Sequence, residues 1–116
     1  MRHSPAKFLF DAKQATALIT EFVAGKSLAD YSASHLLRSG VERQLTIIGE
    51  ALNKLSQLAP GIAARISDYQ KIVAFRNLAV HGYDLLNDET VWGIVKIHLP
   101  VLDKDLESLL KEQNAD

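Results

Sequence analysis

The stretch RNLAVHGY, residues 76–83, places three side chains that can do chemistry among apolar residues. His81 can exchange a proton near neutral pH, and Arg76 keeps its charge and offers a planar fork of N–H donors that matches phosphate oxygens. Tyr83 adds a phenolic hydroxyl two residues after the histidine. These residue types fit acid–base chemistry on a phosphate, but they also occur as ordinary side chains at a helix end.

In the simpler interpretation, Arg76 extends into solvent, His81 caps carbonyls at the end of a helix, and Tyr83 packs over the joint. A regular helix would separate positions 76 and 81 by about 140° around its axis and about 7.5 Å along it. The two side chains can therefore share a site only if the helix end unwinds or a second subunit takes part.

Composition limits the classes of protein that need to be considered. The chain has 116 residues, of which 47% are hydrophobic, so we expect one domain over residues 1–116 with its own core. It has no cysteine, which excludes disulfides, thiolate metal ligands and cysteine nucleophiles. No segment approaches the roughly 18 uninterrupted apolar residues of a membrane span, so we expect a cytoplasmic protein with no membrane contact. With a net charge of −1, nucleic acid can be bound only by a local basic patch.

Helical signals account for the first half of the chain. The first predicted helix has Ser4 as its N-cap, Pro5 at its first position and Gly25 at its end. Residues 27–34 form a short polar turn with room for one helical turn. A long helix then runs to about Leu58, because apolar residues recur at alternating spacings of four and three. Its stripe consists of Leu37, Val41, Leu45, Ile48, Leu52 and Leu55.

The second half continues in the same way. Pro60 and Gly61 end the long helix, residues 62–66 allow a short helical turn, and a third helix is predicted from residue 67 or 68 to about residue 81, with Gly82 as its stop. Asn87 or Asp88 caps the last helix, which Pro100 should kink or divide. The apolar positions of this last element are Val91, Trp92, Val95, Leu99, Leu102, Leu106 and Leu109.

These elements predict an all-α fold, an antiparallel bundle of four to five helices with a short extra helical turn and a proline-kinked last helix. The third helix is apolar around most of its circumference, and such a helix is normally buried on more than one side. A bundle this small covers one side, so a second copy is expected to cover the other, in a homodimer. The apolar residues concerned are Ile72, Val73, Phe75, Leu78, Ala79 and Val80.

Three stretches carry a family resemblance. The run RNLAVHGY resembles the Arg-(four residues)-His-x-Tyr signature of HepT-like ribonuclease toxins, a branch of the HEPN superfamily of small all-helical proteins. The stretch RQLTIIGEALNKLS at 43–56 is similar to the long second helix of that family, and VWGIVKIHLPVL at 91–102 resembles its terminal helix. The three stretches follow one another in the family's order and cover nearly the whole chain.

The resemblance implies a metal-independent endoribonuclease that needs no cofactor and acts as the toxin of a two-gene toxin–antitoxin system. In such an enzyme the 2′-hydroxyl of RNA attacks its own phosphate. Proton transfers and positive charge on the phosphorane are then needed, and His81 and Arg76 can supply them. Asn77 is a supporting residue that donates to phosphate or holds the histidine, or else an exposed amide. The expected products are a 2′,3′-cyclic phosphate and a 5′-hydroxyl.

The resemblance also implies partners. In HEPN dimers the two signatures face each other across the interface, which brings two Arg–His pairs into one cleft. Tyr83 corresponds to the tyrosine that a partner nucleotidyltransferase of the MNT type, the antitoxin, modifies with AMP. The added phosphate would repel and occlude RNA beside His81.

Further residues and other classes of function stay open at this stage. Arg43, Glu50 and Lys54 on the long helix are candidates for cleft or RNA contacts, although a solvated helix face also explains them. A non-catalytic HEPN module that binds nucleotide or RNA, or holds a nucleotidyltransferase, would carry the same signature. A purely structural dimerising bundle is a third interpretation, which the intact signature disfavours.

Overall fold

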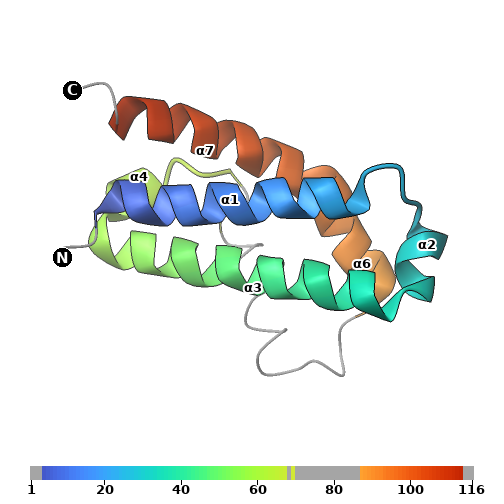
Figure 1. Cartoon of the computed structure of the whole chain (residues 1–116). Helices are drawn as coiled ribbons and strands as arrows, with labels where there is room; N and C mark the ends of the chain where they lie inside the picture. The colour runs from blue at the N-terminus through green and yellow to red at the C-terminus, as the bar shows by residue number, and fades with distance from the viewer. Residues whose placement is uncertain (1–3, 68, 70–86, 114–116) are drawn as a thin grey trace.

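The computed structural model describes residues 4–67, 69 and 87–113, and every element in these ranges is helical. This confirms the all-α fold class. The predicted third helix falls outside the described residues, apart from Ser67 and Tyr69. The elements are α1 (Pro5–Val23), α2 (Leu28–Ala33), α3 (His35–Leu58), α4 (Pro60–Ala63), α6 (Asp88–Gly93), η2 (Ile94–His98) and α7 (Leu99–Gln113), as Figure 1 shows.

Helix α1 begins and ends where its sequence signals predict. Ser4 has the extended backbone of an N-cap, and Pro5 occupies the first turn, where its missing N–H costs nothing. After Val23 the chain reverses through Gly25, whose φ of 73° lies in the left-handed region that glycine adopts without strain. The two ends of α1 are therefore set by local sequence.

Helix α2 is longer than the single turn expected between residues 27 and 34. Ser27 accepts a hydrogen bond from the backbone N–H of Asp30, and the Asp30 carboxylate accepts one from the backbone N–H of Ser27. This reciprocal capping box satisfies two N–H groups that a short helix would otherwise leave unpaired. The helix also buries Tyr31 completely, so tertiary packing adds to the cap.

Helix α3 is the long helix predicted from the apolar stripe. Its N-terminus is capped by Ser34, whose hydroxyl accepts from the backbone N–H of Leu37 at 3.0 Å. Five of the six stripe residues are buried, and Leu37 is partly buried. The following turn differs from expectation, because α4 starts at Pro60 itself, which sits at a first helical position instead of only ending α3.

The last helical stretch changes geometry along its length. Asn87 caps α6, its side chain accepting from the backbone N–H of Thr90 at 2.7 Å, as one of the two predicted caps. The backbone then passes through the π-helical η2 into α7, and the path of the chain bends between α6 and α7 (Figure 1). Proline cannot donate to the preceding turn, and π-helical turns are a known site of helix bending, so the predicted kink occurs with η2 immediately before Pro100.

Packing places α1 at the centre of the described bundle. It lies along α3 on one side and α7 on the other, while α2 packs on α3 and α6 at one end (Figure 1). Buried residues from all of these helices and from α4 form one core cluster. At the α2 end, the rings of Tyr31 and Trp92 lie 5.5 Å apart between centroids, which joins α2 to α6.

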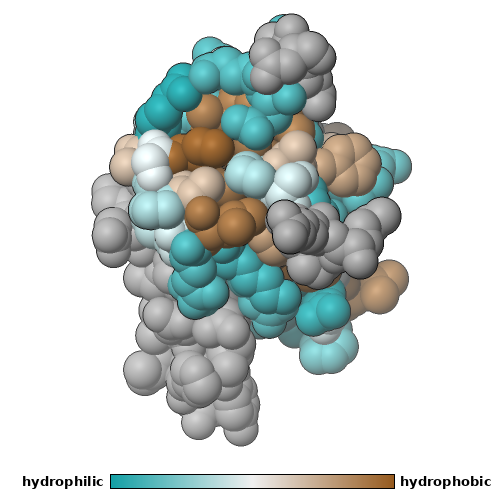
Figure 2. Space-filling view, turned by 90° about the vertical axis from the view of Figure 1, so that its left-hand side faces the viewer, coloured by the Kyte–Doolittle hydropathy of each residue, from teal (hydrophilic) through white to brown (hydrophobic). Residues whose placement is uncertain are grey.

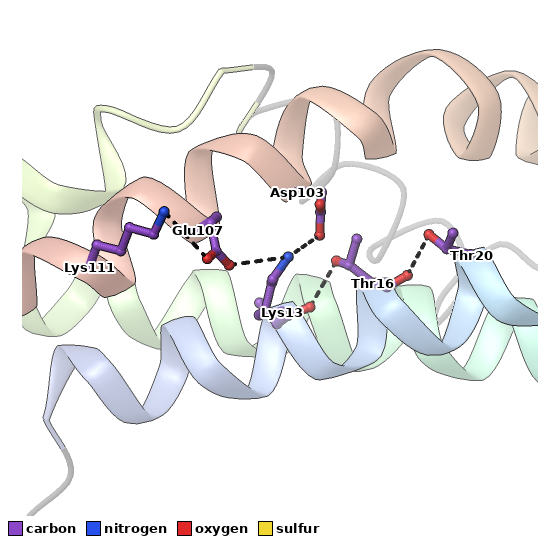
Figure 3. A network of polar contacts seen from close by, with 7 residues as sticks. Lys13, Thr16, Thr20, Asp103, Glu107 and Lys111 are labelled. Carbon is purple, nitrogen blue, oxygen red and sulfur yellow. Dashed lines mark hydrogen bonds and ion pairs between the residues drawn. The ribbon is translucent and has the colours of Figure 1, made fainter. Parts of the chain in front are cut away.

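A polar chain ties α1 to α7 along their exposed edge (Figure 3). The Nζ atom of Lys13 lies 2.6 Å from Oδ1 of Asp103 and 3.5 Å from Oε2 of Glu107, which in turn faces Lys111 at 3.8 Å. On α1 the buried hydroxyl of Thr16 donates to the carbonyl of Ala12, so this core polar group is satisfied. None of the described helices is long and apolar enough to cross a membrane.

Candidate functional site

The residues of the signature lie outside the described part of the chain. Arg76, Asn77, His81 and Tyr83 all fall within residues 70–86. The structure does describe both flanks of this segment, and it describes the other candidates, Arg43, Glu50 and Lys54. The surroundings of the candidate site can therefore be described from these flanks and residues.

The flank before the signature is tied to both α3 and α7. The hydroxyl of Tyr69 donates to the carbonyl oxygen of Leu52 at 3.4 Å, a long hydrogen bond. The backbone N–H of Ser67 donates to Oδ2 of Asp105 at 2.8 Å. Just upstream, the Arg65 guanidinium makes a bidentate pair with the Glu112 carboxylate, at 2.8 and 2.5 Å. The chain thus enters residues 70–86 from a fixed position beside Leu52.

The flank after the signature lies nearer the N-terminal end of α3 than the flank before it. Burial is the main cause that raises the pKa of Glu42 on α3, and the nearby Asp88 carboxylate raises it further. Asp88 begins α6, directly after the cap residue. Glu42 and Leu52 are ten residues apart on α3, about 15 Å at 1.5 Å per residue. The two described flanks of the signature are therefore separated along α3 by about this distance.

Two of the three remaining candidates line one groove. The groove between α1 and α3 has a volume of about 380 Å³, and it includes Glu50 and Lys54. A second hollow of about 470 Å³ shares Lys54 and extends to Leu58. We call the two together the α1–α3 groove. Its lining residues are Lys7, Phe8, Asp11, Gln14, Ala15, Leu18, Gln44, Ile47, Glu50, Ala51, Lys54, Gln57 and Leu58.

The groove follows α3 from Gln44 to Leu58, fourteen residues or about 21 Å of helix. One of its ends opens where α1 begins and α3 ends, the end of the bundle that faces the viewer in Figure 2. There, apolar residues at the centre of the face are bordered by hydrophilic ones (Figure 2). The groove itself is lined by apolar side chains such as Phe8 and Ile47 together with polar ones, and its elongated shape suits a chain-like ligand better than a compact one.

The α1–α3 groove has two basic and two acidic side chains, but its two lysines are not equally free to bind a ligand. Lys7 is paired with Asp11, with Nζ and Oδ2 2.6 Å apart, and its ammonium also lies 5.5 Å from the centroid of the Phe8 ring. Lys54 is exposed and makes no ion pair with any described residue. It is therefore the lysine of this groove best placed to receive a phosphate.

Arg43 is on α3 and exposed, but it is not among the residues that line the groove. Arg43 therefore does not lie with Glu50 and Lys54 in this groove. The structure adds Gln14 and Gln44, amides that can donate to phosphate or base edges. A sequence signal exists only for Gln14, which follows Lys7 and Asp11 at spacings of four and three along one face of α1.

The described residues supply binding groups more than catalytic ones. Among the described residues, the groove offers one lysine without an ion pair, two amides, two carboxylates and an apolar lining, and it includes no histidine for proton transfer near neutral pH. No cluster of three or more His, Asp or Glu side chains within residues 4–67, 69 and 87–113 is arranged to hold a metal ion. The candidates for acid–base chemistry are therefore Arg76 and His81, which lie outside the described residues.

Comparison with known proteins identifies the class. The model of the family described as "Ribonuclease HepT-like" matches residues 12–109, which include the whole signature stretch. The chain therefore belongs to the HepT-like ribonuclease family of the HEPN superfamily, and the resemblance of the three sequence stretches is confirmed at this level.

Individual relatives agree with the family. The chain is similar to two proteins named "Putative RNase", TTE0752 of Caldanaerobacter subterraneus and MJ1380 of Methanocaldococcus jannaschii. The first is 24% identical over 95% of this chain and 97% of its own, and the second is 27% identical over 86% and 91%. A third with the same kind of name, MJ1216, is 24% identical over 90% of this chain. No solved structure gives a significant match.

Proposed function

We propose that the protein is a metal-independent endoribonuclease that acts as the toxin of a two-gene toxin–antitoxin system. The observation that carries the proposal is the family match over residues 12–109, because it spans the Arg76–His81 signature together with the long helix and the terminal helix. The relatives named as ribonucleases are similar over nearly their whole length, which supports the same activity here.

In the proposed reaction the 2′-oxygen of one ribose attacks the adjacent phosphorus, and the bond from phosphorus to the 5′-oxygen breaks. A proton leaves the 2′-hydroxyl and another joins the departing 5′-oxygen, so the products are a 2′,3′-cyclic phosphate and a 5′-hydroxyl. His81 serves as the proton-transfer group and Arg76 as the charge that stabilises the phosphorane. Asn77 supports one of them through a hydrogen bond.

The α1–α3 groove supports this function as a track for the substrate. Lys54 contacts a phosphate of the RNA outside the cleavage position, and Gln14 and Gln44 supply neutral donors along the same channel. Glu50 lies on the same wall and limits the net positive charge of the groove. Such a track binds single-stranded RNA weakly by itself, since a single lysine without an ion pair among the described residues releases few counterions.

Assembly and regulation complete the proposal. The protein forms a homodimer in which the two signatures face one cleft, and a cognate MNT-type nucleotidyltransferase serves as the antitoxin by adding AMP to Tyr83. Both statements rest on what the family resemblance implies. Phosphate beside His81 would compete with the RNA phosphate for the positive charge of Arg76.

The proposed function is tested by cleavage of RNA in the presence of a chelator, with mass analysis of the product ends. His81→Ala and Arg76→Ala are each expected to lower the rate by a factor on the order of 10²–10⁴, because a positioned acid–base or charge-stabilising group is lost. Cyclic phosphate ends that persist in chelator support the mechanism. Full activity in purified His81→Ala protein, or loss of activity on chelation, overturns it.

A further inference from the structure

The turn that follows α4 leads towards the signature segment. Residues 64–67 are not helical, whereas Tyr69 is helical again. Within the turn, the backbone N–H groups of Arg65 and Ile66 donate to carbonyls three residues earlier, at 3.0 and 3.1 Å, and the side chain of Ile66 is buried. These local bonds and one buried side chain define the turn, but contacts from elsewhere in the fold are needed to fix its orientation.

The carboxylate of Asp105 on α7 supplies one such contact. The backbone N–H of Ser67 donates to its Oδ2 atom at 2.8 Å, across 38 residues of sequence. The sequence predicts that a helix begins at residue 67 or 68, and the first N–H groups of a helix have no partner within the helix. Asp105 thus provides, from another helix, the acceptor that an N-cap side chain provides from its own.

The ion pair of Arg65 with Glu112 supplies a second contact between the turn and α7. Two guanidinium nitrogens donate to the two carboxylate oxygens at 2.8 and 2.5 Å. Both side chains are about half exposed, so the pair adds little to the stability of the fold. A bidentate pair does fix orientation as well as distance, because both hydrogen bonds must be made at once.

The two contacts hold the turn at separate points on the same face of α7. Asp105 and Glu112 are seven residues apart, which is about two helical turns or about 10.5 Å along the helix. One contact alone would allow the turn to rotate about it. Two contacts at this separation fix the direction in which the chain leaves the turn.

We infer that Asp105 and the Arg65–Glu112 pair are positioning residues for the ribonuclease reaction, an inference that rests on the proposed function. None of the three lines the α1–α3 groove, the proposed substrate track. They act by setting the start of the segment that carries Arg76 and His81. Catalysis then depends on α7 through contacts that lie outside the signature.

The predicted third helix explains why a small change in the turn affects the rate. Arg76 is nine residues after Ser67, about 13.5 Å along such a helix. A tilt of about 5° at the first turn then moves position 76 by about 1 Å, and a misplacement of this size can lower a rate by a factor on the order of 10². The loss is one of orientation and does not require unfolding.

Steady-state cleavage of RNA by Asp105→Ala protein tests the inference. We expect kcat to fall by a factor of about 10–10², with KM near the wild-type value, because the groove is left unchanged. Asp105→Asn keeps an oxygen acceptor in the same place and should restore most of kcat. Asp103→Ala is the matched control, since it removes a carboxylate of α7 that pairs with Lys13 instead of the turn.

Exchange of the two charges tests the second contact. Arg65→Glu and Glu112→Arg should each lower kcat, because like charges then face each other, and the double variant should recover it. A general effect of surface charge on RNA would act in opposite directions in the two single variants, since one gains negative charge and the other positive charge. Loss in both single variants without recovery in the double variant would contradict the role of this pair.

Amide hydrogen exchange of Ser67 measures the Asp105 contact without RNA. The Ser67 N–H should exchange faster in Asp105→Ala than in the wild type, and Asp105→Asn should restore its protection. Equal exchange in all three proteins overturns the inference. So does an active wild type whose Asp105→Ala variant keeps its kcat, or loses no more than Asp103→Ala, and the proposed function then stands. A wild type that cleaves no RNA overturns the proposed function and the positioning role with it.

Discussion

The Nζ atom of Lys13 on α1 lies 2.6 Å from Oδ1 of Asp103 on α7, across ninety residues of sequence (Figure 3). The lysine side chain is 27% exposed and the aspartate 42%, so solvent weakens the pair. We expect a coupling energy of about 0.2–1 kcal/mol, the range of partly exposed pairs. A double-mutant cycle of Lys13→Met and Asp103→Asn, measured by urea unfolding, gives this energy directly.

The same ion pair predicts how the free energy of unfolding depends on pH. The hydrogen bond with Asp103 is the main cause that raises the pKa of Lys13 above its ordinary value of 10.5. Because the folded pKa lies above the unfolded one, the stabilisation is fully present below 10.5 and is lost as the pH rises through the folded pKa. Asp103→Asn should reduce this alkaline loss, and the remaining part comes from Glu107, which also raises the pKa of Lys13. A coupling energy of zero would mean that the contact between Lys13 and Asp103 does not contribute to the free energy of unfolding.

Tyr31 leads to a second prediction. Its side chain is fully buried, and its hydroxyl has no hydrogen-bond partner among the described residues. Removing an unpaired buried hydroxyl removes a desolvation cost, so Tyr31→Phe should leave the free energy of unfolding unchanged or raise it. Tyr31→Ala is the contrasting variant and should cost about 3–5 kcal/mol, because it empties the space against Trp92. Urea unfolding of both variants is the measurement. Clear destabilisation by Tyr31→Phe would show that the hydroxyl is bonded in solution.

Glu42 gives a third prediction, in which stability again falls as the pH rises, as for Lys13, but in the acid range. Burial is the main cause that raises its pKa above the ordinary 4.5. A carboxyl whose folded pKa is raised is penalised in its ionised form, so this penalty is absent below 4.5 and fully present above the folded pKa. Glu42→Gln should therefore raise the melting temperature at pH 7 and have little effect near pH 4. The exposed Glu21→Gln is the matched control, and an equal change in both variants would refute the burial argument.

The helices that the sequence predicted well are those whose signals are local. The apolar stripe of α3 has one strict period, and its buried residues follow it. Ser4 with Pro5, Gly25 and Asn87 mark ends that depend on only a few neighbouring residues. The full extent of α2 was missed even though the Ser27–Asp30 spacing of its capping box was visible. Six residues are too few for periodicity to show.

The α1–α3 groove could not be predicted, because it depends on which helix faces meet. Gln14 and Gln44 are thirty residues apart and become neighbours of one hollow only when α1 packs on α3. The sequence did indicate that Glu50 and Lys54 lie off the buried stripe of α3, and both line the α1–α3 groove. The π-helical η2 also carried no periodic signal, although Pro100 predicted a bend near it.

Lys54 provides the fourth prediction. In a His81→Ala background, where RNA is bound without being cleaved, Lys54→Ala should weaken binding of single-stranded RNA and reduce the slope of log affinity against log salt by about 0.7, as expected for one lost phosphate contact. The control is Lys104→Ala, another exposed lysine without an ion pair among the described residues. If both variants bind RNA with the wild-type slope, the α1–α3 groove is not the substrate track.

The fifth prediction concerns the modification of Tyr83. The chain has three tyrosines, and the structure describes two of them. Tyr31 is fully buried, and the hydroxyl of Tyr69 donates to the Leu52 carbonyl in a partly buried position. Neither presents a free hydroxyl to another enzyme. Co-expression with the cognate nucleotidyltransferase should therefore add AMP to Tyr83 alone, and the adduct should suppress RNA cleavage because its phosphate lies two residues from His81.

Intact-mass and peptide spectra of the co-expressed pair give the site and the number of AMP groups. Tyr83→Phe should remove the modification and keep RNA cleavage in the presence of the nucleotidyltransferase, because only one hydroxyl is lost. Tyr69→Phe is the matched control, since it removes a hydroxyl only fourteen residues away and should leave the modification intact. An unmodified protein that is nevertheless inhibited by its partner would assign the inhibition to tight binding, with Tyr83 acting only as an aromatic contact.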